Sequence, residues 1–413
     1  MLKLPTIILL CFFLSSDSIF CQFDVLNKVK KKVEEKIDES TKEEKDEEEQ
    51  KESTETEKGE VDQNKEEKTE LKSYSKFDFI SGTNLIFYDD FSMDVVGDFP
   101  QKWNTNGSGE IVTLNNYPGN WFKIQNAVSY LPYLELNSFG DNFTIEVDFL
   151  YDVPKIRNYG TIYFDFYSSD KTDEVPSASS GPYSPGILFD MYADKNGSTH
   201  FNAIGVSADL QRSSPNVTDI KAFKDEEINR LSFSFNKQRL RVYLNEKKVM
   251  DLPRILQSGI NINHLNIRTW YWNTNDDYSI LIRDLRIAQG QPDTRNDLIT
   301  HGKIVTHGIL FDSGSDKIKP ESYGTLKDIS TTLKENSSIK VKVVGHTDSD
   351  GSDESNIELS KKRSDAVKNA LVNEFGIPDS QLETDGKGES EPVGPNDSPE
   401  GKANNRRVEF IKL

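Results

Sequence analysis

The stretch that decides the fold of the carboxyl-terminal region starts with Gly345-His346-Thr347-Asp348, continues with Asn356-x-x-Leu359-Ser360-x-x-Arg363 and closes with Asn405-Arg406-Arg407-Val408-Glu409-Phe410. The apolar run from Ile339 to Val344 predicts a core strand that ends at the first of these motifs. Ser355-x-x-Glu358 predicts a capping box that opens a helix, and Gly376 with Pro378 predicts where that helix stops. A strand followed by a helix therefore carries the central motifs.

The predicted helix has a charged residue in its apolar stripe. Leu359, Val367 and Ala370 share one face of the helix, and Arg363 lies in the middle of it. A guanidinium group in apolar surroundings needs an anionic partner. Because the strand ends at Asp348, near the start of the helix, two arrangements follow. Asp348 and Arg363 face one binding pocket, or they form an internal salt bridge.

Further motifs follow in a fixed order, and together they resemble the OmpA-like peptidoglycan-binding domain. They are Ile309-Leu310-Phe311-Asp312, His346-Thr347-Asp348, the helix motif from Asn356 to Arg363, Gly386-x-Gly388-Glu389-x-x-Pro392 and Asn405-Arg406-Arg407-Val408. The resemblance covers residues 302–413. It implies an α/β domain with a mixed sheet and two main helices.

The resemblance also implies a ligand and a set of binding residues. In that family, the matching Asp and Arg hold the free amino acid end of diaminopimelate in the peptidoglycan stem peptide. Asp348 would then bind the ammonium group, and Arg363 would bind the carboxylate by bidentate hydrogen bonds. The positions that match the rest of the family's pocket are Asp312, Thr347, Asn356, Leu359, Val367 and one of the pair Arg406-Arg407, for which we choose Arg407.

The amino terminus predicts export. Residues 1–21 have the proportions of a secretory signal peptide, with Lys3 ahead of an apolar run that ends near Leu14. Cys21 allows lipidation as an alternative, but Phe20 stands where a lipoprotein signal requires a small residue. Cleavage after Cys21 would remove both cysteines of the chain, so no disulfide is predicted. We expect a protein at the outer membrane that faces the periplasm.

Residues 22–80 form a charged spacer in this interpretation. Within 24–72 there are 19 acidic and 12 basic residues, and no aromatic residue occurs between Phe23 and Tyr74. Such a segment cannot bury a core. Val25, Val29, Val33 and Ile37 are spaced for a short amphipathic helix, with a solvated charge run as the alternative. The net charge of −19 over the whole chain argues against nucleic acid as a partner.

Residues 85–290 show the two-residue periodicity of β-strands. Phe143 to Phe149 alternates strictly, and the run from Leu240 to Val249 predicts a hairpin with Asn245 at its turn. Regularly spaced strands predict an all-β sandwich. The opening Phe87-x-Asp89-x-Phe91 and the run Gly97-x-Phe99-Pro100-x-x-Trp103 resemble concanavalin A-like or laminin-G-like jelly rolls, which implies a glycan or an envelope protein as ligand.

Two alternatives for this region remain. Glu146-x-Asp148-x-x-x-Asp152 comes close to the catalytic signature of jelly-roll glycoside hydrolases, but Asp152 replaces the acid/base Glu. If the segment that carries this signature is a strand, Glu146, Asp148 and Asp152 face outward. The alternating residues Ile145, Val147, Phe149 and Tyr151 then face inward. An outer-membrane β-barrel ahead of the OmpA-like domain is the other alternative, although the strands are short for it.

The chain offers no chemistry for a cofactor or a catalytic metal. Its five histidines are scattered along the sequence: His200, His264, His301, His307 and His346. No nucleophile is paired with a base. We therefore predict a multidomain, non-enzymatic envelope protein without cofactor that anchors to peptidoglycan.

Overall fold

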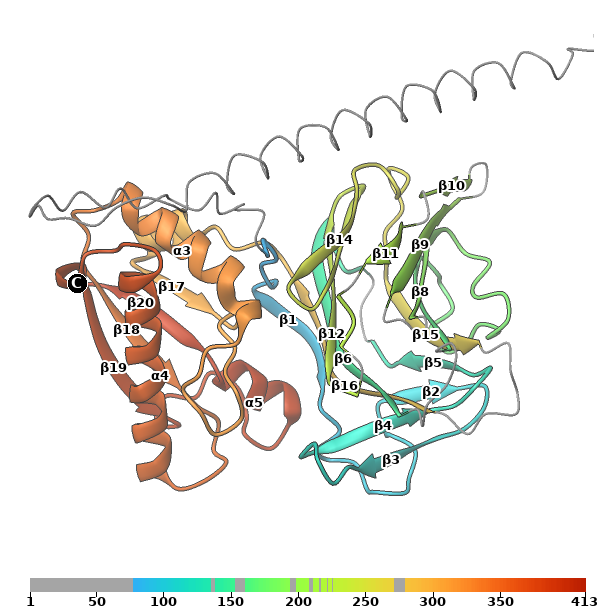
Figure 1. The fold of residues 1–413 in the computed structure, drawn as a ribbon, viewed down its shortest axis with the longest axis horizontal. Helices are drawn as coiled ribbons and strands as arrows, with labels where there is room; N and C mark the ends of the chain where they lie inside the picture. The colour runs from blue at the N-terminus through green and yellow to red at the C-terminus, as the bar shows by residue number, and fades with distance from the viewer. Residues whose placement is uncertain are drawn as a thin grey trace, which may run out of the picture. The chain divides into compact units, whose positions relative to one another are not determined.

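The computed structural model describes residues 77–134, 138–152, 160–193, 198–207, 211–214, 217–220, 222–224, 226–270 and 279–413. The predicted signal peptide, Cys21 and the predicted helix around Val29 lie outside these residues. From Ser73 onward the chain forms one compact unit, which holds two sheet-rich parts (Figure 1). None of the helices in the described part is long and apolar enough to cross a membrane.

The first part contains two antiparallel sheets. One sheet has the order β14 (Lys247–Leu252), β13 (Arg239–Leu244), β12 (Asn229–Asn236), β6 (Asn142–Asp152), β16 (Ser279–Gln289), β4 (Asn120–Ile124), β3 (Gly109–Thr113), and β1 (Asn84–Asp89) also pairs with β16. The other has the order β10 (Gln211–Ser213), β9 (Thr199–Val206), β8 (Gly186–Ala193), β7 (Thr161–Tyr167), β15 (His264–Trp270), β5 (Ser129–Pro132), β2 (Trp103–Thr105), and β11 (Val217–Ile220) pairs with β9.

The two sheets share one apolar core and so form a sandwich. Phe233 of β12 contacts the rings of Phe164 and Phe166 of β7 from the opposite sheet. Each fully buried phenylalanine contributes about 1.5 to 3 kcal/mol through removal of its surface from water. On β6, Ile145, Val147, Phe149 and Tyr151 all belong to this core, which confirms the predicted inward face. The jelly-roll relationship stays a prediction.

The predicted hairpin turn is confirmed at Asn245, which joins β13 to β14. Its backbone is left-handed, with φ 52°, a conformation that Asn tolerates better than most residues. Its side chain accepts a hydrogen bond from the Arg230 backbone and donates one to the Ala222 carbonyl. The turn is thus tied to the start of β12.

Residues just before β1 are part of the packed structure. Phe77 and Phe79 are buried in a cluster with Tyr243 of β13. Both fall within the range 22–80 assigned to the spacer. Folded structure therefore begins at or before Phe77, whereas the remaining limits of the predicted domains stay predictions.

The second part has a four-stranded mixed sheet with the order β17 (Lys303–Thr306), β20 (Val408–Lys412), β18 (Val341–His346), β19 (Leu382–Gly388). The pair β18–β19 is parallel and the other pairs are antiparallel. Its longest helices are α3 (Tyr323–Glu335) and α4 (Asp353–Asn373). Two shorter helices, α2 (Thr294–Asn296) and α5 (Pro399–Asn405), are also present. The single-turn segments are η1 (Asp297–His301), η2 (Pro320–Ser322) and η3 (Asp379–Gln381).

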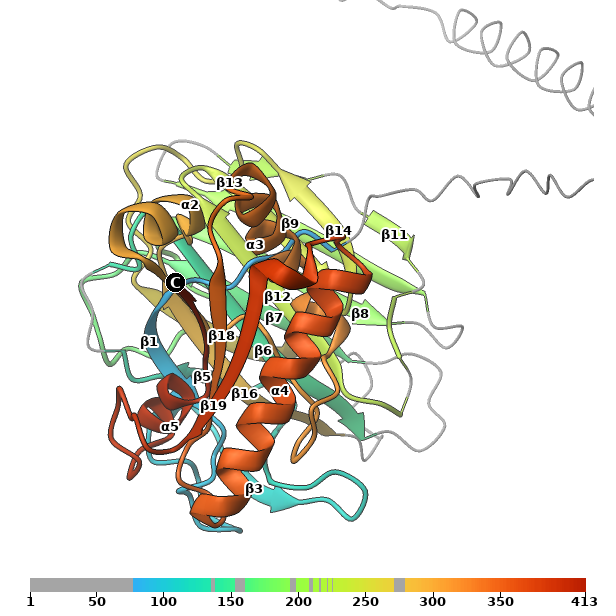
Figure 2. The same ribbon diagram turned by 90° about the vertical axis from the view of Figure 1, so that its left-hand side faces the viewer.

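Helix α4 packs directly against β18 and β19 (Figure 2). A side chain at Gly345 would place its Cβ 2.3 Å from the Ser360 carbonyl oxygen, and one at Gly386 would lie 2.4 Å from the Lys361 nitrogen. Only glycine permits so close an approach. This contact fixes the end of β18 beside the first half of α4.

Two sequence predictions about α4 were wrong in detail. The capping box is formed by Ser352 and Ser355, three residues before the predicted pair, because the helix begins at Asp353. The buried stripe is Asn356, Ser360, Ser364, Val367 and Leu371. Arg363 is half-buried at the edge of this stripe and not in its middle, because small serines, not large apolar residues, face the sheet.

Candidate functional site

Asp348 lies just after β18 and faces Arg406, the residue directly after helix α5. Its Oδ2 accepts a hydrogen bond from Arg406 Nη1 at 2.6 Å, and its Oδ1 accepts one from the Asp350 backbone N–H at 3.3 Å. The Asp348 side chain is 12% exposed. The carboxylate is therefore oriented by two neighbours and still reaches the surface.

Among the described residues, Arg363 on α4 is a half-buried cation without a carboxylate partner. Its Nε donates to the Ser315 carbonyl at 2.9 Å, and its guanidinium lies 4.9 Å from the centre of the Phe311 ring. Burial lowers the pKa of Arg363, and the charge of Asp348 only partly opposes this. Among the described residues, Asp348 pairs with Arg406 and not with Arg363. The internal Asp348–Arg363 salt bridge is thus not formed.

Two polar residues, Thr347 and Asn356, lie next to Asp348. Thr347 donates its backbone N–H to the Gly388 carbonyl, and its buried Oγ1 has no hydrogen-bond partner within the described structure. Asn356 Nδ2 donates to the Asp348 carbonyl at 3.3 Å and to Glu389 Oε2 at 2.5 Å. A buried hydroxyl without a partner is costly unless something else satisfies it. Asn356 therefore contacts the Asp348 backbone, and Thr347 brings its buried hydroxyl next to it.

The other predicted site residues are less directly involved. Asp312 lies in the loop that also holds Ser315, and it pairs with Lys317 at 3.4 Å. Leu359 is half-buried on α4. Val367 is fully buried in the domain core, so its contacts are with the protein interior.

The structure brings Arg406, and not the chosen Arg407, to Asp348. Arg407 is 5% exposed, and its Nε donates to Glu409 Oε1 at 2.8 Å. Residues two apart on an extended chain share one face, so the pattern Arg407-x-Glu409 at the start of β20 could have predicted this internal pair. Arg406 is left on the opposite side, where it pairs with Asp348.

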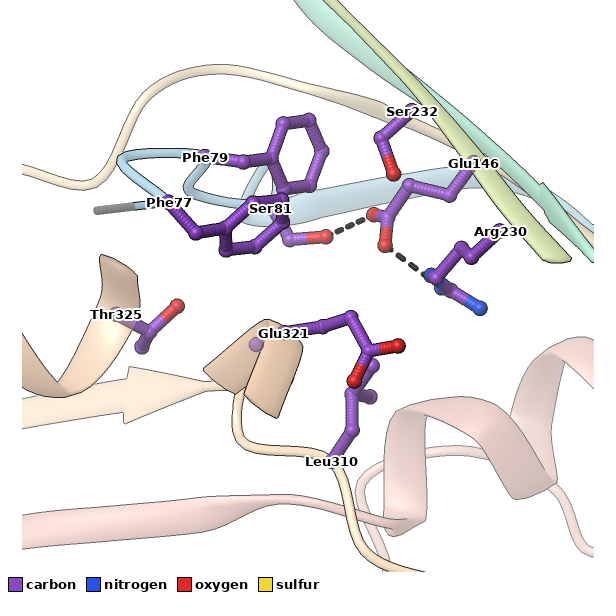
Figure 3. A pocket seen from close by; sticks show the side chains of 10 residues that line it. Phe77, Phe79, Ser81, Glu146, Arg230, Ser232, Leu310, Glu321 and Thr325 are labelled. Carbon is purple, nitrogen blue, oxygen red and sulfur yellow. Dashed lines mark hydrogen bonds and ion pairs between the residues drawn. The ribbon is translucent and has the colours of Figure 1, made fainter. Parts of the chain in front are cut away.

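The carboxylates of the alternative glycosidase signature are engaged elsewhere. Glu146 accepts hydrogen bonds from Arg230 Nη2 at 2.7 Å and from Ser81 (Figure 3). It also accepts one from Arg286 Nη1 at 3.2 Å. Although burial alone would raise the pKa of Glu146, the charges of Arg230 and Arg286 hold it below its ordinary value. Asp148 pairs with the same Arg230 at 2.7 Å. The side chain of Asp152 lies outside the described residues.

These ion pairs are covered rather than exposed to solvent. Glu146 and Arg230 line a small cavity together with Phe77 and Phe79 from the segment before β1, and Glu321 of η2 points toward it from the other side (Figure 3). Glu146 is 3% exposed. Glu146 and Asp148 thus lie on the outward face of β6 as predicted, but both are buried and ion-paired.

Comparison with known proteins places the carboxyl-terminal part in a family. Residues 310–406 match the OmpA family, so the chain carries an OmpA-family domain at its carboxyl terminus. Outer membrane porin F of Pseudomonas aeruginosa is 43% identical over 101 residues, which cover 24% of this chain and 29% of that protein. The probable lipoprotein YiaD of Escherichia coli is 41% identical over 104 residues, which cover 25% of this chain and 47% of that protein.

The chain thus spans less than half the length of these two relatives. A crystal structure of the peptidoglycan-associated lipoprotein from Burkholderia pseudomallei is also similar, with 27% identity. That similarity covers 29% of this chain and 100% of the other, with a TM-score of 0.25. The β-sandwich lies outside the matched residues 310–406.

Proposed function

We propose that the OmpA-family domain binds peptidoglycan non-covalently through the free amino acid end of diaminopimelate in the stem peptide. The observation that carries this proposal is the half-buried Arg363, a cation without a carboxylate partner in the described part of the chain, near the partly exposed Asp348. A free amino acid end presents one ammonium and one carboxylate group. Asp348 and Arg363 supply the two opposite charges that such a zwitterion requires.

Each group has a defined role in this proposal. Arg363 uses Nε for the Ser315 carbonyl, which leaves its terminal nitrogens for a carboxylate. Phe311 supports the flat face of the guanidinium. The Thr347 hydroxyl, which has no hydrogen-bond partner within the described structure, would donate or accept one beside Asp348. Burial keeps water away from these groups and so strengthens the charge-assisted contacts.

The remaining parts of the chain fit an envelope anchor. The two sequence relatives are named as an outer membrane porin and a probable lipoprotein, which supports a place at the outer membrane, facing the periplasm. The predicted signal peptide supports export. The sandwich is non-enzymatic in this proposal, because Glu146 is held by two arginines. Its proposed role is to present a jelly-roll surface to a glycan or an envelope protein.

The test is retention of the purified chain on insoluble sacculi that contain diaminopimelate. Arg363→Ala should weaken the binding free energy by about 2 to 5 kcal/mol. The buried charged contact with the ligand's carboxylate is lost, and only the contact between Asp348 and the ammonium group remains. Arg295→Ala is the matched control, since Arg295 is an exposed arginine whose nearest carboxylate, on Glu335, is 3.8 Å away. Undiminished retention of Arg363→Ala would contradict the proposal.

A further inference from the structure

Helix α5 connects the Asp348 loop to the β-sandwich. On one side, Lys402 pairs with Asp350 at 2.7 Å and Arg406, directly after the helix, pairs with Asp348 at 2.6 Å. On the other side, Glu400 pairs with Lys102 of the sandwich at 2.5 Å. The helix therefore carries contacts to both parts of the Ser73–Leu413 unit.

Arg406 itself lies between the two parts. Its guanidinium is 5.5 Å from the centre of the Tyr88 ring, and Tyr88 belongs to β1 of the sandwich. Tyr88 is 9% exposed, and its hydroxyl donates to Asp284 Oδ1 at 2.7 Å. Asp284 in turn accepts a hydrogen bond from Arg283 on the same strand, β16. The ring under Arg406 is thus fixed by packing and by a hydrogen bond.

We infer that the sandwich completes the peptidoglycan site, because Tyr88 positions Arg406 against Asp348. This inference rests on the proposed function of Asp348 and Arg363. Tyr88 is a positioning residue that acts through Arg406 and does not touch the ligand. The OmpA-family domain and the sandwich then act as one binding unit and not as two independent domains.

The geometry shows what Arg406 contributes. It occupies Oδ2 of Asp348, while Oδ1 receives only a long hydrogen bond from the Asp350 backbone. Oδ1 keeps lone pairs for an ammonium group, and Arg406 stops the carboxylate from rotating. Arg363 supplies a second guanidinium group near Asp348, and its charge favours the ligand's carboxylate. Without the ring, Arg406 loses its cation–π contact and keeps its ion pair with Asp348.

The experiment compares variants of Tyr88 in the full chain on sacculi. Tyr88→Leu should weaken binding roughly two- to fivefold, the effect expected for loss of a partly exposed cation–π contact. Tyr88→Phe keeps the ring and should bind like the wild type. Tyr183→Leu is the control, because Tyr183 is a sandwich tyrosine that is 91% exposed.

A double-mutant cycle separates positioning from a general structural effect. In an Arg406→Gln background, Tyr88→Leu should cause no further loss, since its effect passes through Arg406. An equal loss in both backgrounds, unchanged binding of Tyr88→Leu, or tighter binding would each overturn the inference. If Arg363→Ala also binds normally, the proposed function fails as well. If only Arg363→Ala loses binding, the function stands and the role of Tyr88 does not.

Discussion

The buried charges of the sandwich lead to a prediction about stability. Glu146 is 3% exposed and accepts hydrogen bonds from Arg230 and Arg286. Glu146→Gln keeps the shape of the side chain but removes its negative charge. Both guanidinium groups then face a neutral amide in a buried place. Loss of one partner of a buried ion pair leaves the other charge uncompensated, at a cost of about 3 to 5 kcal/mol.

The structure places the expected effect at the lower end of that range. Arg230 keeps Asp148 as a partner at 2.7 Å, so only Arg286 loses its carboxylate. Arg286 retains hydrogen bonds to Ser81 Oγ and to the Gly82 carbonyl, both at 2.9 Å. We therefore expect a loss of about 3 kcal/mol in the free energy of unfolding.

Urea unfolding followed by tryptophan fluorescence measures this loss, because the fully buried Trp121 belongs to β4 of the same sheet. Glu110→Gln is the matched control. Glu110 pairs with Lys123 at 3.5 Å, with both side chains more than a third exposed, so its loss should cost less than about 1 kcal/mol. Equal stability of Glu146→Gln and wild type would refute the reasoning and show that the ion pairs contribute nothing.

Two further predictions concern a buried acid and a close backbone contact. Burial raises the pKa of Asp89 to about 6, so Asp89 holds its proton more tightly in the folded protein than in the unfolded chain. The free energy of unfolding should fall by up to about 3 kcal/mol as the pH rises from about 4 to about 6, and Asp89→Asn should remove this part of the pH dependence in urea titrations. Gly345→Ala should lower the free energy of unfolding by about 1 to 3 kcal/mol, because the new Cβ would clash with the Ser360 carbonyl. A urea midpoint equal to that of the wild type would contradict this.

Much of the site could be predicted because its key residues follow the local pattern of the chain. The strand that ends at His346 and the helix that carries Arg363 both follow from periodicity and capping residues. The exact face of α4 could not be predicted in this way. Ser360 and Ser364 face the sheet because Gly345 and Gly386 allow the helix to approach closely, and this depends on how the elements meet.

The sequence by itself determined which elements form and which residues carry charge at their ends, because hydrogen bonding and side-chain periodicity act over a few residues. Only the tertiary structure decided how the charges pair. Asp348 meets Arg406, which lies 58 positions along the chain, and Glu146 meets Arg230 and Arg286, which are 84 and 140 positions away. Such partners are chosen by the packing of whole sheets and helices, since a charge is buried only where a distant opposite charge arrives beside it.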